Sequence, residues 1–223
     1  MRERALAKLA FVGALGVLAL ACSLLPGSSG PGAGSGGDPS AEVLFADDFS
    51  DPNSGWDRIQ ADEGITDYAD GRYRIFVNQP QHDYWANPGR SFEDVRVEVD
   101  ATKAGGPDDN DFGLICRYQD TENFYAFLIS SDGYFGVMKV AQGSSEMLGT
   151  DGLQSTDAIR QGATTNHIRG DCVGSQLTLY VNGEKVYSAT DSAFSSGDVG
   201  LLAGTYDISG TDIHFDNFFV YKP

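Results

Sequence analysis

Oxygen-bearing side chains occupy four consecutive positions in one short segment of the sequence. The segment GGPDDNDFG contains Asp108, Asp109, Asn110 and Asp111 between glycines and a proline. Calcium takes about six to eight hard oxygen ligands, which carboxylates, amides and backbone carbonyls of one loop supply. The segment lacks the glycine and the final glutamate of an EF-hand, so the alternatives are another kind of calcium loop or an ordinary polar turn.

Two other segments carry the side chains of a carbohydrate site, which needs a flat ring and a few polar groups that hold sugar hydroxyls. Trp85 lies in QHDYWANPG. If CRYQDTENFY is a hairpin, Arg117 and Tyr125 share one face, whereas Tyr118 and Phe124 share the other. We therefore expect Trp85, Arg117 and Tyr125 to contact a glycan; the alternative is that these side chains are structural.

Catalytic motifs are not apparent in the sequence. There is no G-x-S-x-G segment and no P-loop, and His82, His167 and His214 form no H-x-x-x-H pair. Nucleophilic catalysis therefore has no visible constellation. We assign no catalytic residue, and we expect each histidine to lie on the surface or to pack within a strand.

The chain has three cysteines, Cys22, Cys116 and Cys172. If Cys22 is modified, an even pair remains, and outside the cytosol such a pair persists as a disulfide. A Cys116–Cys172 bond would contribute about 4 kcal/mol in the chain-entropy treatment. The alternative is a pair of buried free thiols.

The N-terminus resembles a secretory signal. A basic start, MRERALAK, precedes the apolar run LAFVGALGVLALA, whose 13 residues are fewer than the ~20 that a membrane-spanning helix needs. The small residue Ala21 before Cys22 resembles the lipobox of bacterial lipoproteins, although Ala19 stands where leucine is commonest. We expect residues 1–21 to be removed and Cys22 to be lipidated; cleavage by an ordinary signal peptidase is the alternative.

The segment after Cys22 predicts a tether. Residues 22–41 are rich in glycine, serine and proline and offer little to bury, so we expect a flexible linker. Removal of residues 1–21 leaves 12 basic and 31 acidic residues, a net charge of −19. Such a surface repels nucleic acid and anionic lipid and suits cations or neutral partners.

Residues 42–223 predict a single all-β domain. In FEDVRVEVDA, Val95, Val97 and Val99 alternate with charged residues, which is the period of a half-buried strand. The Asn182-Gly183 pair in QLTLYVNGEKVYSA is typical of a type I′ hairpin turn. We count eight to twelve such strands, which favours a sandwich or barrel.

The order of several segments resembles the concanavalin A-like jelly rolls, a group that includes laminin G-like and pentraxin-like modules. The matching segments span nearly all of residues 43–222: LFADDFSDPNSGW, YADGRYRI, FGLICRYQDTENFYAFLIS, LTLYVNGEKVYS, GDVGLLAG and IHFDNFFVYK. The layout is also similar to the 3-keto-disaccharide hydrolase-like group. The resemblance implies a two-sheet antiparallel jelly-roll sandwich, whose members bind glycans, in some cases with calcium, and in other cases hydrolyse them.

The resemblance raises two further possibilities. The first and last strands of this fold usually lie side by side, which would bring Asp47 or Asp48 to Asp216 as a second calcium site; alternatively, Asp216 lies in a bulge and bonds backbone amides. Laminarinase-type enzymes of the fold use E-x-D-x-x-E, but EVDATK has Lys103 in place of the second glutamate. A retaining mechanism needs two carboxyl groups, so we expect an exposed strand face there.

These observations lead to three hypotheses. The first is a binding module for a carbohydrate or glycoprotein, lipid-anchored in the bacterial cell envelope outside the cytoplasm. The second is a structural or adhesion domain of the envelope that contacts proteins and has no small ligand. The third is a sugar-processing hydrolase. An aromatic strip on an exposed sheet face would favour the first, and a face filled by the chain itself would favour the second.

Overall fold

The computed structural model describes residues 41–223, so the predicted signal, the lipidation of Cys22 and most of the predicted tether lie outside the described residues. Within residues 41–223 there are strands and no helices, which confirms the all-β prediction. No helix in this range is therefore long and apolar enough to span a membrane.

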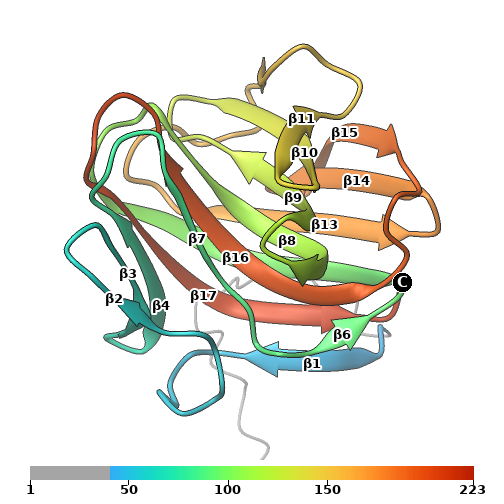
Figure 1. Cartoon of the computed structure of the whole chain (residues 1–223), viewed down its shortest axis with the longest axis horizontal. Coiled ribbons are helices and arrows are strands. Elements are labelled where there is room, and N and C mark those ends of the chain that lie inside the picture. Colours follow the sequence, from blue (N-terminus) through green and yellow to red (C-terminus); the bar gives the residue numbers. More distant parts are fainter. Residues whose placement is uncertain (1–40) are drawn as a thin grey trace, which may run out of the picture. The chain divides into compact units, whose positions relative to one another are not determined.

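Two antiparallel sheets form the domain (Figure 1). Sheet A has the order β15-β14-β13-β7-β17-β4-β3-β2, and β1 also pairs with β17. Its strands are β1 (Val43–Asp47), β2 (Ile59–Gln60), β3 (Gly64–Ala69), β4 (Arg72–Val77), β7 (Val95–Gly105), β13 (Asn166–Val173), β14 (Gln176–Val181), β15 (Glu184–Thr190) and β17 (Thr211–Tyr221).

Sheet B has the order β11-β10-β9-β8-β16-β5, with β12 beside β10 and β6 beside β16. Its strands are β5 (Asp83–Ala86), β6 (Ser91–Phe92), β8 (Asn110–Asp120), β9 (Asn123–Ile129), β10 (Tyr134–Ala141), β11 (Ser144–Met147), β12 (Gln154–Ser155) and β16 (Gly197–Thr205). The architecture is the predicted two-sheet jelly-roll sandwich.

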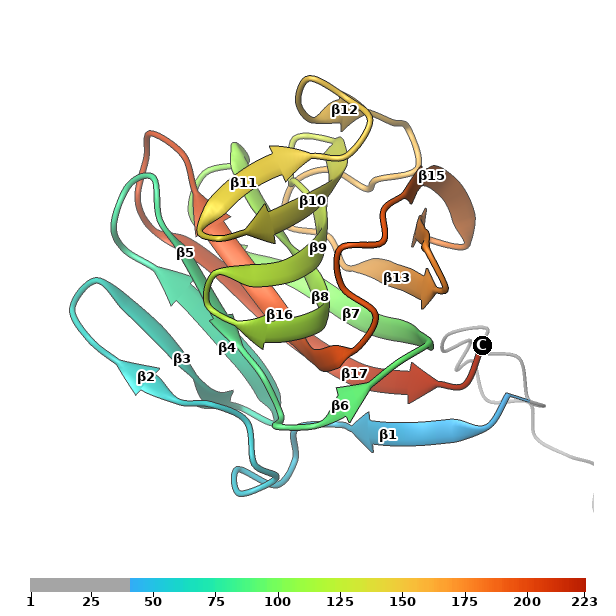
Figure 2. The same ribbon diagram turned by 45° about the vertical axis from the view of Figure 1, so that its right-hand side comes forward.

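Alternating side chains build the core between the sheets. Val95, Val97 and Val99 of β7 are buried in it, as the sequence pattern predicts, and sheet B adds Tyr125 and Phe127 from β9. Figure 2 shows β1 beside β17, close to the C-terminus. The expected pairing of the first and last strands is therefore present.

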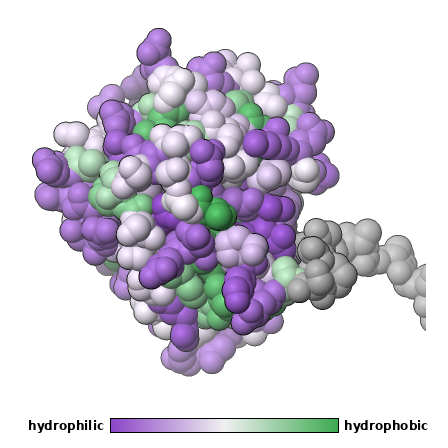
Figure 3. All heavy atoms as spheres, turned by 90° about the vertical axis from the view of Figure 1, so that its right-hand side faces the viewer, coloured by the Kyte–Doolittle hydropathy of each residue, from purple (hydrophilic) through white to green (hydrophobic). Residues whose placement is uncertain are grey.

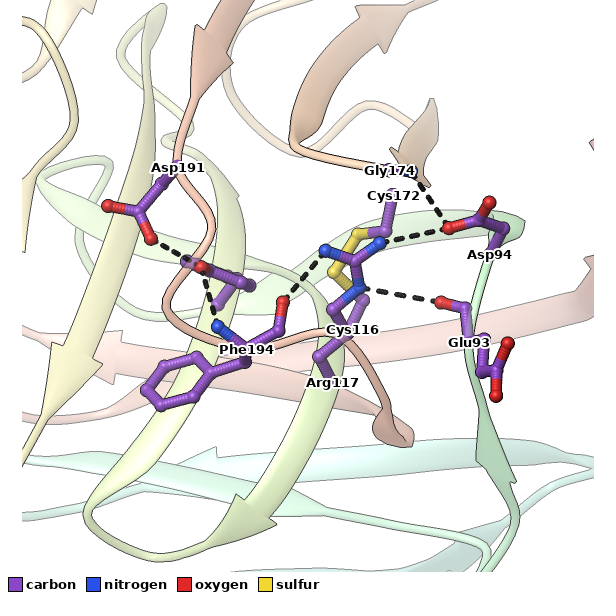
Figure 4. The surroundings of a disulfide bond; sticks show 9 residues. Glu93, Asp94, Cys116, Arg117, Cys172, Gly174, Asp191 and Phe194 are labelled. Carbon is purple, nitrogen blue, oxygen red and sulfur yellow. Dashed lines mark hydrogen bonds and ion pairs between the residues drawn. A yellow bond between two sulfur atoms is a disulfide. The ribbon is translucent and has the colours of Figure 1, made fainter.

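A disulfide connects the two sheets through the core. Cys116 of β8 and Cys172 of β13 are fully buried and bonded, with Cα atoms 6.8 Å apart (Figure 4). The predicted pairing is confirmed. Because the bond closes a loop between residues 56 apart in sequence, it restricts the unfolded chain and ties sheet B to sheet A.

The hairpin turns follow the sequence signals. Asn182 and Gly183 both have positive φ, 51° and 86°, as the predicted type I′ turn between β14 and β15 requires. β8 and β9 are joined at Thr121 and Glu122, within the QDTEN segment. The surface in Figure 3 is mostly hydrophilic, with small separate apolar patches, as expected for an acidic domain.

Candidate functional site

The most unusual group of side chains lies on the outer face of sheet B, the face turned away from the core. Gly204 of β16 pairs with Asp83 of β5 on one side and with Asp111 of β8 on the other. Both carboxylates point to the same face, and a Cβ atom at Gly204 would overlap the Oδ1 atoms of both. Only glycine leaves room for this aspartate pair, Asp83 and Asp111, in adjoining positions.

The aspartate pair differs strongly in exposure. Asp111 is 8% exposed, whereas Asp83 is open to solvent at the edge of the sheet. Burial, and then the negative charge of Asp83, raise the pKa of Asp111 to about 8; the Tyr206 hydroxyl and a backbone amide act in the opposite direction. Although Asp83 is exposed as a residue, the protein atoms packed around its carboxyl group desolvate it and raise its pKa, against the field of His82.

Neither member of the aspartate pair takes part in an ion pair within residues 41–223. Two adjacent carboxyl groups without a counter-ion retain one proton between them near neutral pH. Such a pair accepts and donates hydrogen bonds at once, attracts a cation, and has the groups for general acid–base chemistry.

A cavity of about 400 Å³ lies at the Asp83 end of the pair. We call it the Trp85 cavity. It is lined by Asp57, Arg58, Ile59, Asp83, Tyr84, Trp85 and Thr121. Trp85 points to the outer face two residues along β5 from Asp83, and its ring lies 5.8 Å from that of Phe124. The ring is thus half-buried and supported from behind, with carboxylates beside it.

A second cavity, of about 660 Å³, lies at the Asp111 end. We call it the Tyr134 cavity. It is lined by Asp109, Asn110, Ser130, Asp132, Tyr134, Met147, Gly152, Leu153 and Tyr206. Tyr134 starts β10, and Ser130 directly follows β9, so both lie beyond β8, and the order across sheet B is Trp85 cavity, aspartate pair, Tyr134 cavity. The face therefore carries an acidic band that crosses the strands.

Beyond this band, the centre of the outer face is apolar and filled by the chain's own side chains. Ile115, Leu128 and Leu202 are fully buried there, together with Phe124 and Met138. These side chains form a second, smaller core outside the sandwich. Side chains of the domain itself therefore occupy this part of sheet B, and we take the acidic band and its two cavities as the candidate site.

The prediction that Arg117 and Tyr125 contact a glycan is wrong. The two side chains do share a face of sheet B, but it is the inner face: Arg117 is 2% exposed and Tyr125 is fully buried. Arg117 donates to the carbonyl oxygens of Glu93 and Phe194 and pairs with Asp94 at 3.1 Å (Figure 4). Its five donors make it a strong buried link between strands and loops.

Tyr125 has a similar structural role. Its hydroxyl donates to Asp191 at 2.5 Å and accepts from the amide of Phe194 at 3.1 Å. The hairpin pattern also groups Tyr118 with Phe124, as the structure does, but these two residues lie on the outer side, where their rings are 5.8 Å apart. The sequence pattern identified the faces of the hairpin but not which of them is the interior.

The four residues of the predicted calcium loop do not converge. Asp108 pairs with Lys103, and the amide of buried Asn110 bonds the carbonyl of Pro107 and both the amide and hydroxyl of Ser131. Asp109 lines the Tyr134 cavity and Asp111 belongs to the aspartate pair. Strand β8 starts at Asn110, so successive side chains alternate between faces rather than surround one point.

The residues of the second predicted calcium site do not converge either, and each makes hydrogen bonds with groups close to it. Asp47 accepts from the amide of Phe49 and the Trp56 indole, both within 2.9 Å, and Asp48 caps Ser50. Asp216 accepts from the amide of Asn217 at a bulge in β17, which was the alternative expectation. Across residues 41–223, no three acidic, histidine or cysteine side chains gather as a metal site.

The segment compared with a glycosidase motif lies on the outer face of sheet A. His167 of β13 lies between Asp100, at 2.8 Å, and Glu98, at 3.5 Å. These bonds raise the pKa of His167 to about 9, so it is cationic at neutral pH. Lys103 lies farther along β7 and pairs with Asp108, as described above. Glu98 and Asp100 are members of an ion-pair network.

Sequence reasoning missed Asp83 and its pairing with Asp111. The signal was present in HDYW, where Asp83 and Trp85 must point to one face if the segment is a strand. Asp111 was noted only as a member of a calcium loop. The register that places both beside Gly204 depends on strands distant in sequence, which no local pattern reveals.

Comparison with known proteins gives similarity of structure but not of sequence. No protein family matches the sequence, and no curated protein matches it either. A carbohydrate-binding module from Bacillus subtilis superposes with a TM-score of 0.61 at 19% identity, over 75% of this chain and 96% of that one. A β-glucanase from Bacillus licheniformis gives 0.57 at 11% identity, over 82% and 100%.

A Bacillus subtilis protein of unknown function with a galectin-like fold is similar at a TM-score of 0.58 and 13% identity, over 81% of this chain and 96% of that one. The domain therefore has the concanavalin A-like jelly-roll fold that the order of segments suggested. At these identities the comparison establishes the fold alone, and one fold hosts many functions.

Proposed function

We propose that the domain binds a carbohydrate across the acidic band of sheet B. The observation that carries the proposal is the Trp85 cavity, in which a half-buried indole ring stands beside the carboxylates of Asp57 and Asp83. A pocket with an aromatic wall and few polar anchors is the usual form of a small-ligand site. The cavity contains both kinds of group that a sugar needs: a flat ring for its C–H face and carboxylate oxygens for its hydroxyls.

The cavity is built to keep its form when empty. Phe124 supports the Trp85 ring from the outer face of β9, and Arg58 is held by Asp67 at 2.6 Å. A pre-formed site loses less side-chain entropy on binding, so weak individual contacts to a sugar suffice. The likeness in fold to a carbohydrate-binding module and to a β-glucanase supports the proposal as an analogy.

A glycan array of the purified full-length chain, with calcium and again with chelator, tests the proposal. We expect binding to at least one glycan, and we expect Trp85→Ala to weaken it at least about tenfold because the ring supplies the largest contact area. Tyr180→Ala is the matched control, since Tyr180 lies on the outer face of sheet A under Arg169. Equal loss in both variants, or no glycan bound, would contradict the proposal.

We further propose that the chain is exported and held at a bacterial membrane by lipid on Cys22. The lipobox-like sequence before Cys22 supports this, and so does the Cys116–Cys172 disulfide, since such bonds persist mainly outside the cytosol. Replacement of Cys22 by alanine should move the protein from the membrane to the soluble fraction. Unchanged membrane association of that variant would refute the anchor.

A structural or adhesion role is the second candidate, and one observation favours it. The centre of the outer face of sheet B is filled by Phe124, Met138 and their neighbours, which is the arrangement expected where no ligand lies on a sheet. The Trp85 cavity lies at the edge of this filled region, which is why we prefer the binding role. Retention of envelope integrity or adhesion by Trp85→Ala, with no glycan bound by the wild type, would favour the second role.

A further inference from the structure

The two cavities and the aspartate pair carry an excess of negative charge. Asp57 and Asp83 line the Trp85 cavity, and Asp109 and Asp132 line the Tyr134 cavity. Asp111 lies between them. The one basic residue among the lining residues, Arg58, already pairs with Asp67.

Burial makes this excess charge costly. Asp111 is 8% exposed, and no lysine, arginine or histidine within residues 41–223 forms an ion pair with it or with Asp83. The Tyr206 hydroxyl and a backbone amide replace part of the lost hydration of Asp111, but both are neutral groups and no cation offsets its charge. The groups nearest to it, Asp83, Asp109 and the Tyr206 hydroxyl, provide no positive charge.

We infer that the ligand of this site carries a positively charged amino group, which pairs with Asp83 and Asp111. The inference rests on the proposed carbohydrate site and makes it specific: the ligand class is an amino-sugar oligosaccharide with free amines. An ammonium has three N–H donors and no acceptor, so it bonds both carboxylates of the aspartate pair at once. Uronic acids and sulfated sugars are repelled by the same charges.

The position of the pair suits an oligosaccharide. The acidic band runs from β5 through β16, β8 and β9 to β10, which is four inter-strand spacings or roughly 19 Å. A chain that enters both cavities has to cross the aspartate pair, which lies between them. An amine on the unit that crosses the pair lies where the unpaired charge is greatest.

A divalent metal fits less well than an ammonium. Calcium needs about six to eight oxygens, but only two carboxylates meet at Gly204, and residues 41–223 contain no cluster of three metal-ligating side chains. Two carboxylates suffice for an ammonium group, because each of its N–H bonds needs one acceptor. Calcium therefore enters the test as a competing outcome.

The test compares three β-1,4-linked tetramers that differ only at C2: glucosamine, N-acetylglucosamine and glucose. Dissociation constants for the full-length chain are measured by calorimetry, with chelator, at a pH at which the amine is protonated. We expect the glucosamine tetramer to bind at least about tenfold more tightly than either neutral tetramer, with a steeper loss of affinity as salt is added. Asp111→Asn and Asp83→Asn should each reduce this preference toward unity.

Asp171→Asn is the matched control, because Asp171 pairs with Arg169 on the outer face of sheet A. It should retain the preference for the amine. Asparagine is close in size to aspartate, and unfolding of each variant is monitored so that loss of fold is not taken for loss of preference. The proton held by the aspartate pair gives a second signal: an ammonium should displace it, so the binding enthalpy should vary with the ionisation enthalpy of the buffer.

The outcomes separate this inference from the proposed function. Equal affinity for all three tetramers, or a preference that persists in both aspartate variants, would leave carbohydrate binding in place and overturn the amine. Binding that appears only with calcium would also overturn it, since the pair would then hold a metal. Binding of no saccharide, neutral or cationic, on the tetramers or the array would remove the proposed function itself.

Discussion

The outer faces of the two sheets differ in whether their carboxylates are paired with cationic side chains. On sheet A, carboxylates face cations: Glu98 and Asp100 enclose His167, and Arg74 donates twice to Asp212 at 2.8 and 2.7 Å. On sheet B, Asp83 and Asp111 face each other with no ion-pair partner among the described residues. Both faces consist of antiparallel strands, so the strand geometry does not account for the difference.

The contrast distinguishes carboxylates that stabilise the fold through ion pairs from carboxylates that have no cationic partner in the domain. A paired network on a half-exposed face is favourable or neutral, whereas an unpaired buried carboxylate subtracts from stability. Natural proteins retain such costs mainly at functional sites. The aspartate pair of sheet B is therefore the place where the sequence departs from what stability alone would select.

The largest expected effect comes from filling the gap between the two aspartates. Gly204→Ala places a Cβ atom against both carboxylates, and Asp111 has no room to move. We expect a loss of about 3 kcal/mol in unfolding free energy, within the range for overpacking. Gly152→Ala is the control, because a Cβ there would meet nothing within 4 Å. Urea unfolding measures both, and similar values for the two would show that the gap is not occupied.

Opposite signs are expected for two Asp→Asn substitutions, one on each face. Asp111 keeps its proton to about pH 8 in the folded state but only to its usual 3.8 when unfolded, so stability present at low pH is lost as pH rises through this window. Asp111→Asn removes that loss. We expect a gain of about 2 kcal/mol at neutral pH, reduced from the full linkage value because the new amide needs partners.

Asp100→Asn should instead destabilise the protein. Burial alone would raise the pKa of Asp100, but bonds from His167 and Asn217 outweigh it and keep the pKa below its usual value. Removal of the charge leaves the imidazolium with Glu98 alone, for an expected loss of about 2 kcal/mol. Unfolding curves of the two variants at neutral pH decide the matter; a shift of both in the same direction would break the comparison between the faces.

Much of the fold followed from the sequence because its signals are local. Alternation placed the valines of β7 in the core, Asn182-Gly183 fixed a hairpin turn, and the count of cysteines identified the disulfide pair. Each of these depends on a few neighbouring residues or on a count. The order of segments then sufficed to identify the jelly-roll sandwich.

The site was less predictable because it depends on register between distant strands. Trp85 lines a cavity on the outer face of sheet B, whereas Arg117 and Tyr125 point inward. Which face of a strand becomes the interior is set by what packs against it, and this is not visible in the local pattern. Asp83, Asp111 and Gly204 come from three separate strands. Their meeting could be seen only once β16 was known to lie between β5 and β8.

The next prediction concerns stability at alkaline pH and the ion pairs on the outer face of sheet A. The bonds to Asp100 and Glu98 raise the pKa of His167 from its usual 6.5 to about 9. The resulting stability is complete below pH 6.5 and is lost as pH rises through about 9. Because the ring is partly exposed, we expect about 1.5 kcal/mol. The difference between wild type and His167→Gln, measured by urea unfolding across this range, should shrink to near zero; a constant difference would contradict it.

The smallest expected effect concerns stability at acid pH and the Arg74–Asp212 pair on the outer face of sheet A. Burial opposes ionisation of Asp212, but bonds from His214 and Arg74 prevail and lower its pKa to about 2. Its contribution is therefore present above pH 3.8 and is lost as pH falls through about 2, the reverse of the Asp111 case. Arg74→Gln should cost about 1 kcal/mol at neutral pH, since the pair is only partly buried, and this cost should vanish in acid. If Arg74→Gln changed ligand binding more than acid stability, charge on sheet A would also serve recognition, and the division between the two faces would fail.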